Sequence, residues 1–557
     1  MLKKFFKASL AVLAIVIAVT AFNSLAFQKR NNNRPLSSYY KKGVFHLHSS
    51  FSDGRGGMDE ICRDASAQAL DFVILTDHGR PNLQASAATA WIHDTLLIGA
   101  SEFSLHSGHL AAAGYRTPGY IFPPEPQEAI SEVNRDGGVT FISHPLDRKI
   151  PWTDWQVRDF TGIEIMSMYQ MAKKNLLYGL TLFPLQYMLN SDYALTSLIS
   201  YPHKELEIWD GFNREGKYYG IYALDTHAKL PISKKTSLHF PSYGATFKIL
   251  RIYVKVDREL EQDARAAAAT VISSLRRGDF FCVIESLAAA NGFENYYLER
   301  DGRQVEMGGD ARGAGGTLVL KLPFNFSTDI KIKKDGKIFK KIRDNSRSEI
   351  TIPISRPGVY RCEISPHSGP GRDLPWILAN PIFIDRSRNP EKPESITPRR
   401  ILAMSGNYFQ IEKNPLSQAA MQVDDQASNQ PVIRFTYVLR QESPAERNFW
   451  TALAHRENLD FSKYQGFVFE ARGSRPMRFW LQFRNGEGRL ESAFQHSFLV
   501  GENWQQIAIP FARFHRLYGP EATPDLEKIS AFFFTIDNGN SFSGTRGEIS
   551  LRAISLY

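Results

Sequence analysis

The sequence predicts a multidomain protein with an α/β domain first and all-β domains after it. The chain has 557 residues, more than one hydrophobic core usually organises, so roughly two to four domains are expected. Up to about residue 290, short apolar runs alternate with helix-compatible stretches, a pattern typical of a parallel sheet or barrel. Beyond Asn291, strand-like runs succeed one another with turn residues between them, which is typical of β-sandwiches.

The first residues have the pattern of an export signal. Three lysines precede an apolar run over residues 8–19, which continues less cleanly to Phe27. Ser24-Leu25-Ala26 offers a small-x-small cleavage site, yet the run is nearly as long as the ~20 residues that span a bilayer. We therefore expect residues 1–26 to be a signal peptide or a membrane anchor, with a linker over 27–42. Either alternative predicts export. The protein is expected either in a bacterial-type periplasm or anchored in the membrane and facing the periplasmic or extracellular side.

In the α/β region, predicted over 43–290, the strand candidates end at side chains that can bind metals. In parallel sheets and barrels, the carboxyl ends of the strands gather the reactive groups. Buried carboxylates are rare unless they are paired or bind a metal, so solvent exposure explains this placement poorly. The strand candidates and the residues that end them are 43–45 with His46, 72–75 with Asp77, 96–99 with Glu102, 139–142 with His144, and 219–223 with Asp225.

The pair His46 and His48 opens this series. Side chains alternate along an extended chain, so the two imidazoles are expected on one side, where they can bind one metal together. An isolated His-x-His occurs often by chance, and its weight here comes from the other motifs downstream of it. These are, in chain order, His48-Ser-x-x-Ser-Asp53-Gly, Thr76-Asp77-His78, Glu102 with Gly108-His109-Leu110, Ser143-His144-Pro145, and Asp225-x-His227.

Together these motifs resemble the PHP (polymerase and histidinol phosphatase) family of metallohydrolases. The resemblance implies a distorted (β/α)7 barrel with two or three divalent ions, which would be zinc, manganese or iron. Asp53 stands where many relatives have histidine, and its harder oxygen favours manganese or iron in that site. The implied ligand sets are His46, His48, Glu102 and Asp225 for one ion, Glu102, His109 and His144 for a second, and Asp53, His78 and His227 for a third.

The implied chemistry is hydrolysis. Two divalent ions bridged by a carboxylate produce hydroxide near neutral pH and neutralise charge on a phosphoryl or acyl oxygen. Asp77 is expected to orient His78, and with Glu102 and His144 it makes up the expected catalytic set. Three cations come closely after metal motifs and are candidates for gripping an anionic substrate, although ordinary surface charge is the alternative for each. They are Arg80, Arg148 and Lys229.

Three functions stay open at this point. A phosphomonoesterase or phosphodiesterase comes first, because phosphoester hydrolysis is the common activity of the family. A carboxylic ester or carbamate hydrolase is the alternative, because Pro357-Gly358-Val359-Tyr360-Arg361 and the segment 375–382 resemble the β-sandwich of a carbaryl-hydrolase-like branch. The third is an envelope glycan-binding protein whose PHP domain is only a scaffold.

The rest of the chain divides into further regions. An apolar segment over 175–200 is interrupted by polar residues and proline, so we expect a buried helical insertion, with a lid or membrane-touching element as the alternative. A small β-sandwich is expected over 291–386, and its segment 329–342 has the pattern of a hairpin around Asp335-Gly336. A linker is expected over 387–400.

Residues 401–557 look like a galactose-binding-like jelly roll, as in many carbohydrate-binding modules. Aromatic residues recur there, at Phe449-Trp450, Phe479-Trp480 and Trp504. Aromatic side chains in a sandwich usually belong to the core, and stacking on a glycan or binding a protein partner are the alternatives.

Charge and cysteine content exclude some classes. The formal charge of +9 is spread along the chain without a compact basic stripe, so we expect no nucleic-acid partner. A mild attraction to anionic membranes or phosphorylated substrates is compatible with it. The three cysteines, Cys62, Cys282 and Cys362, are too few and too widely spaced for a disulfide framework, and we expect them to be buried apolar residues.

Overall fold

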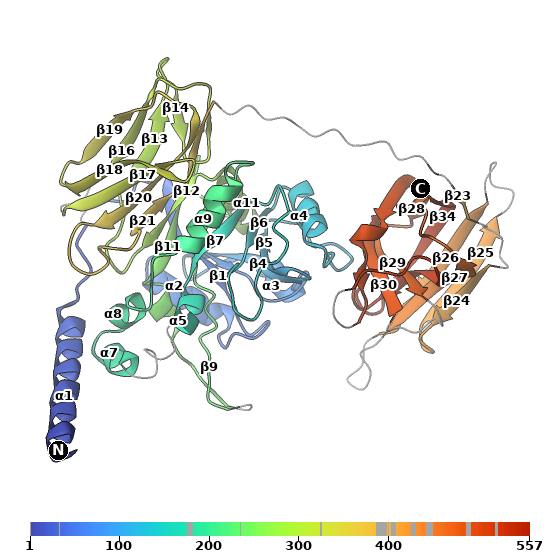
Figure 1. Cartoon of the computed structure of the whole chain (residues 1–557), viewed down its shortest axis with the longest axis horizontal. Helices are drawn as coiled ribbons and strands as arrows, with labels where there is room; N and C mark the ends of the chain where they lie inside the picture. The colour runs from blue at the N-terminus through green and yellow to red at the C-terminus, as the bar shows by residue number, and fades with distance from the viewer. Residues whose placement is uncertain are drawn as a thin grey trace. The chain divides into compact units, whose positions relative to one another are not determined.

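The structure is a computed structural model that describes residues 2–557 except for 33, 175–181, 234–235, 323–325, 386–397, 399, 403–407, 425–430, 442–448, 486–491 and 519–521. Most of the predicted linker 387–400 therefore lies outside the described residues. The chain forms two compact units, which are described separately (Figure 1). Unit 1 comprises Met1–Arg116 and Pro126–Arg388, and unit 2 comprises Thr117–Glu125 and Asn389–Tyr557.

Unit 1 is mixed α/β, as expected. Its central strands run in the order β1-β2-β4-β5-β6-β7-β8, parallel except for the hairpin of β4 and β5 and the antiparallel pairing of β5 with β6. Beyond β8 the chain returns to β1, where the amide of Asp225 donates to the carbonyl of His46 (2.7 Å) and that of His48 to Thr226 (3.0 Å). The bounds are β1 (Tyr40–Leu47), β2 (Phe72–Leu75), β4 (Thr95–Leu105), β5 (Gly108–Ala113), β6 (Val139–Ile142), β7 (Gly162–Ser167) and β8 (Tyr219–Ala223).

Helices connect these strands. One of them is α11, which is capped at its start by Asp263, whose side chain accepts a hydrogen bond from the backbone of Ala266. Its end is capped by Gly278, which has a left-handed φ of 76°. The helices are α2 (Met58–Ala67), α3 (Leu83–Ala87), α4 (Pro126–Arg135), α5 (Met168–Lys174), α7 (Phe183–Leu189), α8 (Ser191–Thr196), α9 (His203–Phe212), α10 (Tyr243–Thr246) and α11 (Ala264–Arg277).

Part of the next β-rich region continues the same sheet. β12 pairs with β21, so this sheet extends through β20, β22, β15, β17 and β18. A separate sheet has the order β14-β13-β16-β19. The predicted hairpin is observed as β17 and β18, with Asp335 and Gly336 both at positive φ in its turn. The strands are β11 (Leu250–Lys255), β12 (Phe280–Ile284), β13 (Glu294–Leu298), β14 (Gln304–Glu306), β15 (Asp310–Ala311), β16 (Thr317–Lys321), β17 (Thr328–Lys334), β18 (Lys337–Asn345), β19 (Glu349–Pro353), β20 (Gly358–Pro366), β21 (Ile377–Ala379) and β22 (Ile382–Ile384).

A buried ion network also joins β20 to α9. Arg361 donates to both carboxylate oxygens of Asp210 (2.6 and 2.7 Å) and to Glu363 (2.7 Å). All three side chains are buried, and Arg361 lies over the ring of Trp209. Burial acts to lower the pKa of Arg361, but the paired carboxylates raise it overall, so the guanidinium stays charged.

Unit 2 contains two antiparallel sheets around an apolar core. One has the order β25-β26-β34-β28-β31, and the other β24-β27-β33-β29-β30-β32. Phe449 and Phe479 lie in the core. Trp480 is buried, and its ring N–H donates a hydrogen bond to the carboxylate of Asp537 (2.9 Å). The strands are β23 (Arg400–Ile401), β24 (Phe409–Lys413), β25 (Gln418–Asp424), β26 (Val432–Val438), β27 (Trp450–Leu459), β28 (Gly466–Gly473), β29 (Met477–Asn485), β30 (Ala493–Val500), β31 (Gln505–Pro510), β32 (His515–Arg516), β33 (Ile529–Asp537) and β34 (Arg546–Leu556).

The N-terminal segment forms one helix, α1 (Leu2–Ala26). Its stretch Ser9–Ala26 has a mean hydropathy of 2.2, and its apolar side chains are mostly exposed. Such a helix does not serve as a core element, and it fits a signal sequence or a membrane anchor. The three cysteines are buried and unpaired.

Candidate metal centre

The nine predicted metal-binding residues of unit 1 come together. His46, His144 and Asp225 stand at strand ends as expected, whereas Glu102 lies within β4, which runs on to Leu105. The nine residues fall into overlapping groups, in each of which the candidate ligand atoms lie within 4.8 Å of one another. The groups are His46, His48 and Glu102; His46, His144 and Asp225; His78, Glu102 and His109; and His48, Asp53, His78 and His227.

The backbone at these strand ends departs from extended geometry. His46, His144 and Asp225 have φ of 64°, 28° and 51°, the left-handed region that side chains with a Cβ rarely adopt. The pairing of β1 with β2 shifts register between Phe45 and Leu47. The alternation expected for His46-x-His48 is therefore interrupted, although the two Nε2 atoms still lie only 3.2 Å apart. Strained backbone of this kind concentrates at functional sites.

Glu102 occupies the middle of the cluster. Among the described residues, five imidazoles approach its carboxylate at 3.0–3.4 Å. Oε1 faces His144, His109 and His46, whereas Oε2 faces the other two. Burial acts to raise the pKa of Glu102, but the imidazoles, His46 first, hold that pKa well below its usual range. A carboxylate with its two oxygens directed at different imidazole sets can bridge two cations.

Asp225 and Asp53 lie on two other sides of His48. Asp225 Oδ1 is 3.4 Å from His48 Nε2, and Asp53 Oδ1 is 3.7 Å from His48 Nδ1 and 3.3 Å from His227 Nε2. Burial acts to raise the pKa of both carboxyls, and the neighbouring histidines lower it overall. Asp225 is buried and Asp53 is half-exposed, so the cluster opens to solvent on the Asp53 side.

The donor set fits divalent cations. Nδ1 of His48, His78 and His144 are buried atoms without a hydrogen-bond partner among the described residues. Unpartnered buried polar atoms are costly, and three in one cluster of imidazoles and carboxylates fit a cation-binding site. Nitrogen and oxygen donors in this mixture suit zinc, manganese and iron.

Glu164 belongs to this site and was missed from the sequence. It lies on β7, fully buried, with Oε1 2.5 Å from Nδ1 of His46 and Oε2 accepting the backbone N–H of His144 (2.7 Å). Such a carboxylate sets the tautomer and orientation of a metal-binding imidazole. Its signal in the sequence is an acidic residue between two isoleucines of an otherwise apolar strand.

Asp77 makes contacts other than the expected one with His78. Its carboxylate accepts hydrogen bonds from the backbone and hydroxyl of Ser49 (2.9 and 2.7 Å) and from Ser52 Oγ (2.5 Å). These contacts fix the loop between His48 and Asp53, and Asp77 is not part of the ligand groups found among the described residues. The geometry therefore favours a role in holding this loop over a direct catalytic role.

Of the three predicted substrate-binding cations, Lys229 contacts the cluster. Its Nζ donates to the backbone carbonyl of Asp53 (3.0 Å). Arg80 is half-buried and Arg148 is exposed. A further cation at this rim is Lys173, whose Nζ lies 4.2 Å from the centre of the Tyr169 ring, which is itself 5.3 Å from His227.

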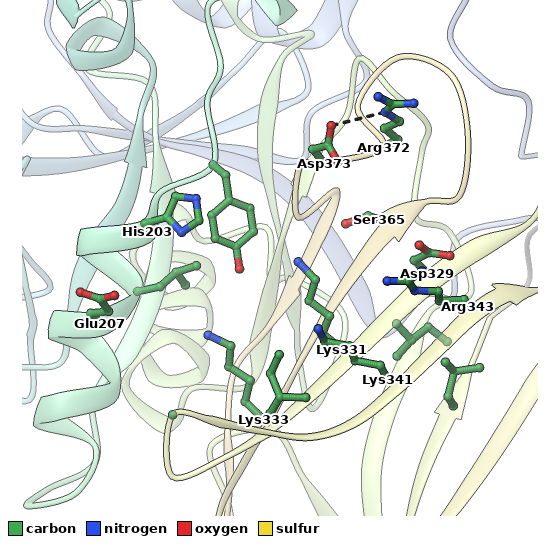
Figure 2. A pocket seen from close by; sticks show the side chains of 16 residues that line it. His203, Glu207, Asp329, Lys331, Lys333, Lys341, Arg343, Ser365, Arg372 and Asp373 are labelled. Atoms are coloured by element: carbon green, nitrogen blue, oxygen red, sulfur yellow. Dashed lines mark hydrogen bonds and ion pairs between the residues drawn. The ribbon is translucent and has the colours of Figure 1, made fainter.

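A cavity of about 530 Å³ elsewhere in unit 1 contains none of these residues (Figure 2). It lies between α9 and the β17–β18 hairpin and is lined by several lysines and arginines. Lys333 pairs with the buried carboxylates of Asp210 (3.7 Å) and Glu363 (3.5 Å), and Lys331 lies 3.9 Å from Glu363. These two lysines offset buried negative charge, which is a structural role.

No family model and no curated protein matches this sequence. Among solved structures, the chain is similar to a two-domain protein containing a predicted PHP-like metal-dependent phosphoesterase from Bacteroides vulgatus, at 15% identity, over 64% of this chain and 99% of that one, with a TM-score of 0.29. It is also similar to a family 11 carbohydrate-binding module from Clostridium thermocellum, at 15% identity, over 29% of this chain and 96% of that one, with a TM-score of 0.23. A family 30 carbohydrate-binding module matches at 12% identity, over 29% and 84% of the two chains, with a TM-score of 0.20. The chain thus has a distant structural match to a PHP-like protein and distant matches of its β-sandwich to carbohydrate-binding modules.

Proposed function

We propose that this chain is a metal-dependent hydrolase of the PHP type that cleaves a phosphoester. The observation that carries the proposal is the cluster itself, in which Glu102 lies between five imidazoles with its two oxygens facing different ones. A protein without metal chemistry has no evident use for so many buried donors in one place. We also propose that the strands from β1 to β8 form the distorted barrel of this family.

The proposed ligand sets overlap with the geometric groups without coinciding with them. His46, His48, Glu102 and Asp225 would hold one ion, Glu102 with His109 and His144 a second, and Asp53, His78 and His227 a third. The third set falls within one group, whereas the groups join His144 to His46 and Asp225, and His109 to His78 and Glu102. Bound divalent ions would lower the pKa of water and neutralise charge on a phosphoryl oxygen.

Residues around the cluster would hold the ligands and the substrate in position. Glu164 holds the ring of His46 and the backbone of His144, and Asp77 holds the loop that carries His48 and Asp53. Lys229, at the rim beside Asp53, offers a cation for an anionic substrate group. A cation at the mouth favours phosphate esters over neutral carboxylic esters or carbamates.

Elemental analysis of the purified full chain, with activity on chromogenic phosphate and carboxylate esters, tests the proposal. We expect two or more bound metal ions, as in carboxylate-bridged sites, with phosphoester hydrolysis lost in His144→Ala. His203→Ala is the matched control, since His203 is exposed and lies outside the cluster. A chain that stays metal-free and inactive after addition of zinc, manganese or iron contradicts the proposal. Activity on carboxylic esters alone would assign the alternative hydrolase.

Glycan binding by unit 2 stays a prediction with less support. Trp480 is buried, and Trp504 lies under the guanidinium groups of Arg472 (5.0 Å) and Arg552 (4.2 Å). Among the described residues, Tyr408 and Tyr518 are exposed and able to stack on a sugar. The structure therefore favours the interpretation that most aromatic residues of unit 2 are structural.

A further inference from the structure

The C-terminal end of α1 is docked into unit 1. Thr20 and Ser24 are buried, and the side-chain amide of Asn190 donates to the carbonyls of Ser24 (3.1 Å) and Phe27 (3.2 Å). The ring of Phe27 packs against Tyr193 at 5.3 Å. These contacts lie on both sides of the candidate cleavage point after residue 26, so the helix end is part of the folded unit. The rest of the helix exposes its apolar side chains and requires apolar surroundings.

An apolar surface continues from α1 across unit 1. Helix α7 packs beside α1 and exposes 86% of Met188. On its other side, the α7 ring of Tyr187 lies 4.7 Å from Phe240, which comes after the short hairpin of β9 (Leu230–Pro231) and β10 (Ser237–Leu238). Ile232 in this hairpin is 61% exposed. Figure 1 shows α1, α7 and β9 at one end of unit 1.

The same hairpin borders the open side of the metal centre. It begins directly after His227 and Lys229, and Lys229 donates to the carbonyl of Asp53 (3.0 Å). The guanidinium of Arg55, from the loop that carries Asp53, donates to the carbonyl of Ser237 in β10. The side chain of Asp53 is 52% exposed, so the mouth of the centre adjoins this hairpin, on which Leu230, Ile232 and Leu238 are exposed.

We propose that α1 remains as a membrane anchor, that α7 and the β9–β10 hairpin rest in the bilayer surface beside it, and that the metal centre takes its substrate from that surface. The substrate class is a phosphoester carried by a lipid, and this part rests on the proposed function. Large exposed apolar side chains next to a spanning helix are stabilised by insertion into the interface. Lys229, at the mouth, suits the phosphate of an anionic headgroup, whereas the nearby Lys173 already pairs with Asp147 (3.3 Å).

Spin labels on the full chain in vesicles of phosphatidylcholine and phosphatidylglycerol test the membrane surface. The native cysteines are buried, so single cysteines at Met188→Cys and Ile232→Cys can be labelled selectively. Ile338→Cys is the matched control, an exposed isoleucine on β18. We expect the labels at 188 and 232 to collide with oxygen more than with a water-soluble nickel chelate, and the control to show the reverse. Water-like behaviour at all three positions would overturn the proposal.

Hydrolysis assays on the same vesicles test the substrate. Phosphatidic acid and phosphatidylglycerol are compared with the water-soluble p-nitrophenyl phosphate and bis-p-nitrophenyl phosphate. The double variant Met188→Ser with Ile232→Ser should lose about tenfold in rate on the lipid ester, because α7 and the hairpin no longer hold the mouth of the metal centre at the bilayer surface, and keep its rate on the soluble ester. Ile338→Ser should change neither rate.

The outcomes separate the two proposals. Equal rates of the double variant and the parent on the lipid ester would overturn the role of α7 and the β9–β10 hairpin in taking substrate from the bilayer surface, while leaving the hydrolase intact. Hydrolysis of the soluble esters only, with none of the lipids, would overturn the lipid substrate and also leave the hydrolase intact. Hydrolysis of no ester by the metal-loaded parent would overturn the proposed function and the lipid substrate with it, and the spin labels would still decide the membrane surface.

Discussion

Among single residues, His46, His144 and Asp225 could be singled out because each stands at the end of an apolar run, a pattern visible in one sequence. The other candidate ligands came from the resemblance to a family. The backbone that presents the first three could not be predicted, because the left-handed conformations of His46, His144 and Asp225 arise from long-range pairing of strand ends. Glu164 was missed because one acidic residue inside a strand has no local partner in the sequence. Its partners, His46 and the amide of His144, become neighbours only when β1, β6 and β7 pair.

Replacing Glu164 by glutamine should weaken metal binding without unfolding the chain. The neutral amide accepts the hydrogen bond from the imidazole more weakly than the carboxylate does, so His46 becomes a poorer ligand. Losses of about 10–100-fold in metal affinity are typical when such a partner is replaced. Zinc titration measured by calorimetry gives the change. Glu207→Gln, an exposed residue on α9, is the control and should bind metal as the parent does. Unchanged affinity in Glu164→Gln, or equal loss in the control, would contradict the assigned role.

The buried carboxyl of Asp279 should make the free energy of unfolding depend on pH. Burial raises the pKa of Asp279 to about 7, well above the 3.8 of an unperturbed carboxyl. Between these values the folded state holds a proton that the unfolded state has released, so stability falls as pH rises, by up to about 4 kcal/mol over the full window. Asp279→Asn should remove this slope and be more stable than the parent at pH 8. Thermal midpoints from pH 5 to pH 8 measure it, with the exposed Asp301→Asn as control. An unchanged slope in Asp279→Asn would show that this carboxyl is already ionised.

Among secondary-structure elements, local patterns predicted β2, β6, β8 and the β17–β18 hairpin closely, because buried strands and Asp-Gly turns leave strong local signals. Pairing between distant elements was not predicted. β12 and β21 join the two parts of unit 1 into one sheet, a contact between segments far apart in the chain. The expected buried insertion over 175–200 is only partly buried, because α7 exposes Met188, and residues 175–181 lie outside the described residues.

The network between α9 and β20 should control the stability of unit 1. Arg361→Ala leaves Asp210 and Glu363 buried without their guanidinium, and breaking one partner of a buried ion pair costs about 3–5 kcal/mol. Differential scanning calorimetry should show a lower unfolding transition for unit 1. Arg343→Ala, at an exposed arginine on β18, should leave that transition in place. Equal transitions in both variants would mean that the two carboxylates take up protons or water at little cost.

For the whole molecule, the pattern of apolar residues correctly indicated an α/β part with all-β sheets after it, because the spacing of apolar runs changes along the chain. The bounds of each compact unit could not be predicted from one sequence, because they depend on which strands pair into the same sheet. The positive charges behind the net charge of +9 are spread along the sequence, so they do not mark a binding surface.

Removing metal should affect one unit only. A ligand that binds the folded state stabilises it in proportion to the logarithm of its concentration over the dissociation constant. Treatment with a chelator should therefore lower the unfolding transition of unit 1, and the transition of unit 2 should stay. Scanning calorimetry before and after chelation, with zinc returned as the control, measures this. Coincident shifts of both transitions, or no shift, would contradict a metal site confined to unit 1.

The most direct test of the central claim is anomalous X-ray scattering from crystals of the metal-loaded chain, recorded at the absorption edges of zinc, manganese and iron. The proposed site predicts two or more peaks around Glu102, with at least one within bonding distance of each carboxylate oxygen, about 2.0–2.2 Å for zinc. The absence of anomalous density at Glu102, in crystals that contain the metal elsewhere or not at all, would contradict the claim that this cluster is a hydrolytic metal centre.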